Sequence, residues 1–320
     1  MNIDLLLENL TNPALLFFLL GVIAVKLKSD LEIPPNSSKF ISLYLLFSIG
    51  FKGGQELAHS HFTLEIVWSI IFGVLIAIII PVYCFFILRR KFNIFDSGAI
   101  AAAYGSVSAV TFVTAASFLE IQYLKFSGHM VAVMALMEAP AIIVGVILIR
   151  MFDKKQESKT SLGSLIQHSF TNGSVLLILG SLIIGMLASD EQALGIKPFT
   201  NDLFKGFLAI FLLDMGIVSG RKLGDFIKSG WFAVIFALAI PLFNGCLVAF
   251  ASQLVTTDIG NRFILAILAA SASYIAVPAA MKIAVPKANP SLFLPMALAV
   301  TFPFNITLGM PIYISIIMYC

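Results

Sequence analysis

The sequence predicts an all-α membrane protein with ten transmembrane helices arranged as a five-plus-five inverted repeat. Three observations support this fold class. Hydrophobic residues make up 59% of the 320 residues and charged residues only 12%, which is about half the charge of an ordinary soluble domain. Apolar runs long enough to cross a bilayer recur along the chain. Short stretches of the first half also reappear, in the same order, in the second half.

Ten apolar runs are candidate spans, because each is bounded by charged residues, glycine or proline. They cover residues 12–28, 36–51, 63–88, 97–119, 128–150, 172–189, 203–219, 230–254, 262–284 and 290–318. One long polar segment lies between the fifth and the sixth run. We therefore expect a first five-helix repeat over residues 1–151, a cytoplasmic linker over 152–170 and a second repeat over 171–320.

The two halves resemble one another at several places. Residues 46–57 (LFSIGFKGGQEL) align without gaps on residues 212–223 (LLDMGIVSGRKL). Trp68 and Trp231 each begin a span that carries a proline further along. Helices rich in leucine, alanine and glycine can also resemble one another by chance. The shared order of the matches favours a repeat.

The positions of lysine and arginine predict the orientation in the membrane. With the N-terminus outside, fifteen of the twenty basic residues fall in inside loops, as the positive-inside rule requires. Both termini are then expected on the outer side of the inner (plasma) membrane. Because five spans is an odd number, the second repeat enters from the opposite face. An inverted repeat of this kind is typical of alternating-access transporters.

The fourth and the ninth span, which we expect to be discontinuous helices that cross one another, are each interrupted near the middle by small and hydroxylated residues. Aligning Ser106 with Ser271 also places Ser108 on Ser273. A broken helix turns free N–H groups and a positive dipole end toward the gap, which suits a small oxyanion. The expected substrate-binding residues are Gly105, Ser106, Ser108, Ala270, Ser271 and Ser273. The alternative is close helix packing through small residues.

Glu138 lies in the middle of the fifth span. A carboxylate inside a membrane is costly unless it is paired, so it predicts a functional site. It could ligate Na⁺, carry a proton or pair with a base. Oxygen ligands suit a hard cation, and the expected Na⁺ ligands are Glu138, Thr111, Thr301 and Asn305. The alternative is a protonated structural glutamate that is hydrogen-bonded to a neighbouring helix.

Asp214, toward the inner end of the seventh span, is expected either to line a vestibule or gate, or to pair with Lys205 or Arg221. Other classes of function find little support. The chain has no P-loop, no zinc-ligand spacing and no set of nucleophile, base and metal ligands inside the spans, so no enzyme is predicted. A net charge of +3 does not predict a nucleic-acid partner.

Five motifs resemble the sodium-dependent bicarbonate transporters of the cyanobacterial type. They are GSVS with the threonine that follows it (residues 105–111), LMEAPA (136–141), LLDMGIVSGRKL (212–223), AASASYIAVPAA (269–280) and TFPFNITLGMPIY (301–313). The likeness runs over essentially the whole chain. Glu138 stands where this family usually has an aspartate, and Ala109 and Val110 replace small or polar residues.

The resemblance implies a secondary active transporter that imports bicarbonate together with Na⁺. It also implies a mobile core domain from spans 3–5 and 8–10 and a gate domain from spans 1, 2, 6 and 7. A homotrimer in the lipid bilayer is expected, as is a small PII-like cytosolic regulator that docks on the polar segment between the repeats. Two other functions stay open. One is Na⁺-coupled symport of another small anion, such as a carboxylate, and the other is anion binding or sensing without transport.

Overall fold

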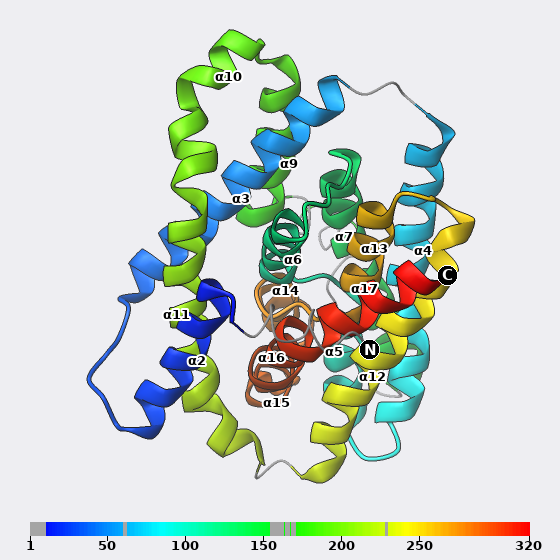
Figure 1. Ribbon diagram of the computed structural model, residues 1–320. Coiled ribbons are helices and arrows are strands. Elements are labelled where there is room, and N and C mark those ends of the chain that lie inside the picture. The colour runs from blue at the N-terminus through cyan, green and yellow to red at the C-terminus, as the bar shows by residue number, and fades with distance from the viewer. Residues whose placement is uncertain (1–10, 60–62, 154–162, 164–166, 168–170, 228–229) are drawn as a thin grey trace.

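The computed structural model describes residues 11–59, 63–153, 163, 167, 171–227 and 230–320, and every regular element among them is helical. The predicted all-α class is confirmed. Most of the expected cytoplasmic linker, with the expected docking segment for a regulator, lies outside the described residues. Figure 1 shows the helices, which are α2 (Pro13–Lys26), α3 (Pro35–Ala58), α4 (Leu64–Leu88), α5 (Ile94–Gly105), α6 (Ala109–Ile121), α7 (His129–Phe152), α9 (Gly173–Leu187), α10 (Asp190–Lys197), η1 (Pro198–Asp202), α11 (Phe204–Ile227), α12 (Trp231–Ala251), η2 (Ser252–Leu254), α13 (Ile259–Ala270), α14 (Ala276–Ala284), α15 (Pro290–Pro295), η3 (Met296–Thr301), α16 (Phe302–Phe304), η4 (Asn305–Gly309) and α17 (Met310–Tyr319).

Six helical segments of the described chain are long and apolar enough to cross a membrane. They are Leu64–Leu88, Ile94–Ile121, His129–Phe152, Asp190–Leu223, Trp231–Leu254 and Pro290–Tyr319. Three shorter apolar helices, α2, α9 and α13, accompany them. These segments indicate a multi-pass membrane protein. The count of ten spans and the inverted relation of the two halves stay predictions.

Several helices begin where the sequence places a short polar side chain that can accept a hydrogen bond from the first helical turn. Asn93 caps α5, Asn172 caps α9 and Asp258 caps α13 in this way. Ser108 caps α6 by accepting a hydrogen bond from the Thr111 amide. The capping residues therefore fix where a new helix starts inside a chain that is apolar almost throughout.

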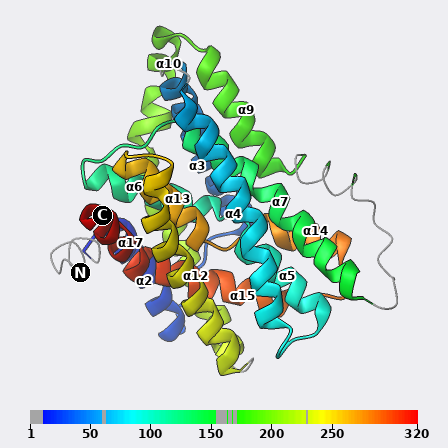
Figure 2. The ribbon, with the colours of Figure 1, turned by 90° about the vertical axis from the view of Figure 1, so that its right-hand side faces the viewer.

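The helices form two groups. In the first, which we call the panel, α2 packs along α11, α3 packs along α9, and α3 also contacts α11; Figures 1 and 2 both show α3 lying alongside α9. In the second, the main bundle, α4 packs on α5 and α7, while α12, α13 and α17 pack on one another. The groups meet where α11 contacts η3 and α15, and where α3 contacts α6 and α7. The panel contains the helices of the predicted gate, and its motion against the main bundle stays a prediction.

Glycines let the backbones of the panel helices touch. A Cβ atom at Gly50 of α3 would lie 2.8 Å from the Ile178 carbonyl oxygen of α9. At Gly216 of α11 it would overlap the Phe18 carbonyl oxygen of α2. Without a hydrophobic driving force between helices in lipid, such close packing is a main source of association. Gly50 and Gly216 are aligned in the predicted repeat, and each packs against a helix of the opposite half.

The fourth and ninth candidate spans leave helical geometry near the middle. Between α5 and α6, Ser106 and Ser108 are both extended. Between α13 and α14 the chain is extended at Ser271 and becomes helical again at Ala276. Pro278 lies in the first turn of α14, where a missing N–H does no harm. Crossing of these two interrupted helices within the membrane stays a prediction.

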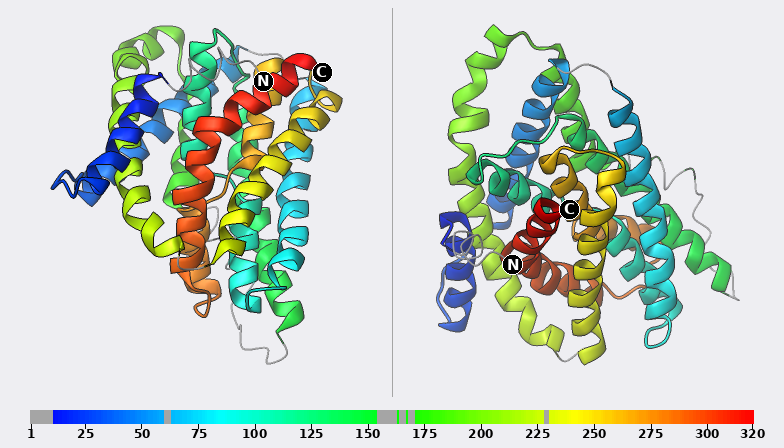
Figure 3. Two further views of the ribbon diagram at one scale, coloured as in Figure 1. Left: turned by 60° about the horizontal axis from the view of Figure 1, so that its bottom comes forward. Right: turned by 45° about the vertical axis from the view of Figure 1, so that its right-hand side comes forward.

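The last candidate span is less regular than the sequence predicts. Two π-helical stretches, η3 and η4, are inserted between α15, α16 and α17, and Figure 3 shows the segment as one curved orange-to-red rod. Three prolines, Pro295, Pro303 and Pro311, lie in or beside these stretches. A proline removes a backbone donor and clashes with the preceding turn, which disturbs the regular winding of the helix. Thr301 and Asn305 lie on the two π-helical stretches.

Candidate functional site

The two helix breaks are in direct contact. The Ser108 amide of the first break donates a hydrogen bond of 3.0 Å to the Ser271 hydroxyl of the second. The Ser273 amide of the second donates one of 2.8 Å to the Ala103 carbonyl near the end of α5. Each break therefore supplies partners for backbone groups that the other has freed, as irregular backbone at membrane depth requires. The four serines of the breaks, Ser106, Ser108, Ser271 and Ser273, are all at most 4% exposed.

Three of these serine hydroxyls already have partners. Ser108 Oγ accepts from the Thr111 amide at 3.1 Å, and Ser273 Oγ accepts from the Val277 amide at 3.3 Å. Ser271 Oγ donates to the Leu268 carbonyl at 2.9 Å. The Ser106 hydroxyl is buried and has no hydrogen-bond partner among the described residues. A buried polar group without a hydrogen-bond partner requires an explanation. A ligand that binds to the Ser106 hydroxyl would supply that partner.

A small cavity of about 30 Å³ lies beside the breaks. Ser108, Ser273 and Glu138 line it, together with Leu46, Val107, Ala109, Ser174, Tyr274, Ile275 and Ala276. Its volume is enough for one or two water molecules. The described contacts give Glu138 neither a hydrogen-bond nor an ion-pair partner. An unpaired carboxylate thus faces serines of both breaks across a space that suits a small cation.

A larger pocket of about 420 Å³ adjoins this cavity and shares Ser174, Tyr274 and Ile275 with it. We call this pocket the vestibule. Asp214 lines it and accepts a hydrogen bond from the Ser38 hydroxyl. Asp214 thus lines this pocket, and its role in a vestibule or gate stays a prediction. Arg221 interacts electrostatically with Asp214 and also lies 3.8 Å from Glu32, whereas Lys205 lies 3.3 Å from Glu120.

Thr301 and Asn305 do not line the cavity of Glu138. The Thr301 hydroxyl donates to the Ala237 carbonyl at 2.8 Å and lies 2.7 Å from the Tyr104 hydroxyl. The Asn305 amide donates to the Ala270 carbonyl at 2.8 Å, at the end of α13. Both side chains are thus engaged in pairing backbone and neighbouring side chains. Of the expected Na⁺ ligands Thr111, Glu138, Thr301 and Asn305, Glu138 alone lines this cavity.

The remaining expected residues support the breaks. Thr111 is buried at the start of α6, where its amide is held by Ser108, and Ala270 contributes its carbonyl to Asn305. Gly105 packs against α4, because a Cβ atom there would overlap the Pro81 ring and lie 3.2 Å from the Ala77 carbonyl oxygen. At Gly105 the structure therefore agrees with the alternative of close helix packing.

Among the described residues there is no cluster of three or more histidine, cysteine, aspartate or glutamate side chains. A cation bound here would therefore depend on one carboxylate and on neutral oxygens, an arrangement suited to a hard monovalent ion. Two polar lining residues are not among those expected from the sequence. Tyr274 and Ser174 line both the cavity and the vestibule. Tyr274 follows Ser273 directly within the second break, and this neighbouring position could have predicted that Tyr274 lines the cavity.

Comparison with known families agrees with this geometry. Residues 13–318 match the model of the Na⁺-dependent bicarbonate transporter superfamily. A comparison with curated protein sequences gave no match. The match to the family model covers nearly the whole chain, and with it the resemblance inferred from the sequence motifs is confirmed. The chain belongs to the Na⁺-dependent bicarbonate transporter superfamily.

Proposed function

We propose that the protein is a secondary active transporter that imports bicarbonate coupled to Na⁺ by alternating access. One observation carries the proposal: two interrupted helices meet beside a cavity that also holds an unpaired Glu138. Freed N–H groups and serine hydroxyls suit an oxyanion, while the carboxylate suits a cation. Following the family, we expect a homotrimer in the inner membrane with both termini outside.

The charges favour an order of binding in which Na⁺ precedes the anion. A bicarbonate ion next to an unpaired carboxylate would be repelled, and the repulsion is stronger in a site with little water. Na⁺ bound at Glu138, with oxygens of Ser108 and Ser273 in reach, would remove this repulsion. The cavity of about 30 Å³ is too small for both ions, so the breaks must separate slightly when bicarbonate enters from the vestibule.

The membrane potential makes coupling necessary. Moving one elementary charge against 100 mV costs about 2.3 kcal/mol, and a potential negative inside drives bicarbonate outward. One co-transported Na⁺ cancels this cost, and the inward Na⁺ gradient then supplies the work. A second Na⁺ would make uptake respond to the potential itself.

Uptake of radiolabelled bicarbonate into proteoliposomes tests the proposal. Uptake should saturate and rise with external Na⁺, and it should fall to background when choline replaces Na⁺. Protein-free liposomes measure the background from CO₂ that crosses the lipid. A strong protein-dependent signal that ignores Na⁺ would contradict the coupling.

A second candidate substrate is a small carboxylate. Much of the cavity wall is apolar, with Leu46, Val107 and Ala109 among its residues, and an apolar wall suits an alkyl group better than a third oxygen. In the same assay, acetate or formate should compete strongly if a carboxylate is the true substrate. Stabilisation of the folded protein by bicarbonate without any uptake would instead indicate a binding or sensing protein.

A further inference from the structure

Among the described residues, two ion pairs join the panel to the main bundle, and both end on Glu120. Its carboxylate lies 3.8 Å from Lys52 Nζ of α3 and 3.3 Å from Lys205 Nζ of α11. By contrast, the pairs of Arg221 with Glu32 and of His59 with Asp190 stay within the panel and its connecting segments. We call Glu120, Lys52 and Lys205 the Glu120 cluster.

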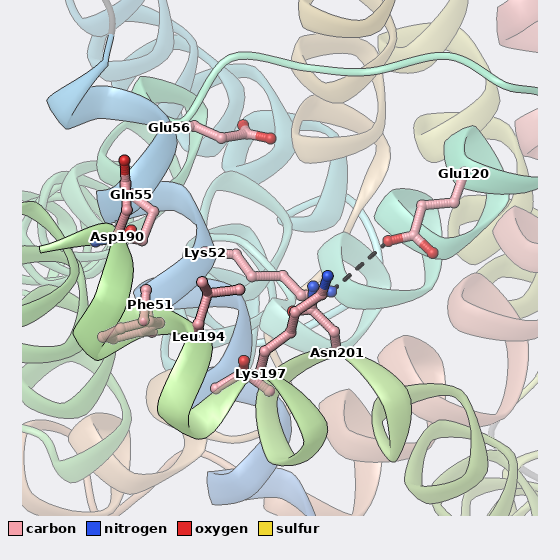
Figure 4. A pocket seen from close by; sticks show the side chains of 11 residues that line it. Phe51, Lys52, Gln55, Glu56, Glu120, Asp190, Leu194, Lys197 and Asn201 are labelled. Carbon is pink, nitrogen blue, oxygen red and sulfur yellow. Dashed lines mark ion pairs between the residues drawn. The ribbon is translucent and has the colours of Figure 1, made fainter. Parts of the chain in front are cut away.

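Glu120 occupies a poor place for a carboxylate within its own helix. It is the second-last residue of α6, where the partial negative charge of the helix end repels an anion. The two lysines of the panel offset that repulsion. Lys52 is held in place from the other side, because its Nζ lies 5.0 Å from the centre of the Phe204 ring. Figure 4 shows Lys52 and Glu120 reaching toward one another across a pocket.

The Glu120 cluster and the vestibule lie at opposite ends of the helices that connect them. On α3, Ser38 lines the vestibule and Lys52 belongs to the cluster, and fourteen residues of helix separate them by roughly 21 Å. On the main bundle, α6 begins at the break beside Ser108 and ends next to Glu120, a length of roughly 18 Å. The vestibule faces the predicted inner side, so the cluster lies at the predicted outer side.

A cavity of about 160 Å³ lies under the Glu120 cluster, between α3 and α6. Apart from charged side chains, residues such as Ile49, Gly53, Ala116 and Phe126 line it. On α6, Ala116 borders this mostly apolar space one helical turn before Glu120. The ion pairs therefore bridge α3 and α6 at the place where an opening between panel and main bundle would begin on the outer side.

We propose that Glu120 is a positioning residue of the transport cycle. Its ion pairs with Lys52 and Lys205 hold the outer side closed while the vestibule is open, and they break in the outward-facing state. The inference rests on the proposed alternating access. Exposed ion pairs are individually weak, which suits a latch that must open in every cycle. Removing such a latch shifts the balance between the two states rather than abolishing either of them.

Thiol labelling of purified protein tests the latch without any assumption about the substrate. In a background in which Cys84, Cys246 and Cys320 are replaced by serine, Ala116→Cys reports on the outer cavity and Ile275→Cys on the vestibule. We expect Glu120→Gln to raise the labelling rate at Ala116→Cys by about threefold to tenfold. The same change should lower the rate at Ile275→Cys. Equal rates with and without Glu120→Gln, or a rise at both reporters, would overturn the proposal.

Two further variants make the test specific. Glu56→Gln removes a carboxylate that lines the same cavity but joins none of the described ion pairs. Because Glu56 interacts with Lys52 and Lys125 only at longer range, it should change both rates by less than Glu120→Gln. Lys205→Gln removes one pair from the panel side and should shift both rates in the direction of Glu120→Gln, by less. If the labelling rates shift as expected but the protein takes up no bicarbonate, the latch is supported and bicarbonate is rejected as the substrate. Na⁺-dependent uptake with unchanged labelling would reject only the latch.

Discussion

The predicted outer and inner ends of the boundary between panel and main bundle differ in chemistry. At the outer end, Glu120 binds lysines from two panel helices. At the inner end, Asp214 instead accepts a hydrogen bond from Ser38 within the panel and lines a vestibule of about 420 Å³. Glu120 bridges the two groups and Asp214 does not, although Ser219 of α11 donates a hydrogen bond of 2.9 Å to the Leu298 carbonyl of η3 at that end. A pocket of about 500 Å³, lined by Lys52 and Glu120 among others, also lies at the Glu120 end, so the two ends differ in the contacts that bridge the groups and not in the presence of a space.

The predicted repeat makes the difference sharper. The alignment of residues 46–57 on 212–223 places Lys52 on Val218, and the alignment of Ser106 on Ser271 places Glu120 on Val285. Val218 lines the vestibule and Val285 is buried. If the two halves share one fold, the inner end has valines where the outer end has an ion pair. The two halves of the fold would then differ in charge at these two aligned positions.

The largest expected effect comes from filling the space between the breaks. Ser108→Leu places a branched side chain in a cavity of about 30 Å³, so uptake should fall to the protein-free background. Ser108→Ala, which leaves the cavity open, should retain clearly more uptake. Size-exclusion chromatography checks that both variants remain folded. Full uptake by the leucine variant would show that the substrate does not bind at the helix breaks.

Neutralising Glu138 should have the next largest effect. Glu138→Gln keeps the size and loses the charge that attracts Na⁺, and we expect the Na⁺ concentration for half-maximal uptake to rise by about tenfold, which corresponds to about 1.4 kcal/mol. Glu138→Asp keeps the charge and should stay close to the parent. An unchanged Na⁺ response in the glutamine variant would mean that Glu138 has a structural role.

A smaller effect is expected at the inner carboxylate. Asp214→Asn retains an acceptor for Ser38 but removes a negative charge from the vestibule. Loss of this long-range attraction should change the apparent Na⁺ affinity by about twofold to threefold, and high ionic strength should reduce the difference. Ser38→Ala serves as the control, because it removes the hydrogen bond and keeps the charge. An effect as large as that of Glu138→Gln would instead make Asp214 part of the ion site.

The fold class and the place of the breaks could be predicted because the bilayer restricts the chain so strongly. Lipid cannot satisfy backbone groups, so a cluster such as Gly105, Ser106 and Ser108 within an apolar run predicts either a gap or a close packing contact. In the structure the cluster contains both: Gly105 packs on Pro81, and the serines form the break. Glu138 could be singled out for the same reason.

The neutral oxygens of the site could not be predicted in the same way. A threonine hydroxyl or an asparagine amide can bind Na⁺ or satisfy a freed backbone group equally well. Thr301 and Asn305 do the latter, and they lie on π-helical stretches whose side-chain directions no 3.6-residue period predicts. The Glu120 cluster could not be predicted from the sequence either, because Lys52, Glu120 and Lys205 come together only through the packing of three helices.

Reciprocal flux measures the central claim most directly. If the two breaks and Glu138 hold Na⁺ and bicarbonate in one site, each ion must promote binding of the other. In proteoliposomes, bicarbonate should therefore stimulate uptake of radioactive Na⁺, and Na⁺ should stimulate uptake of bicarbonate, with a fixed ratio of the two fluxes across concentrations. Na⁺ uptake that is indifferent to bicarbonate, beside bicarbonate uptake that is indifferent to Na⁺, would contradict the account.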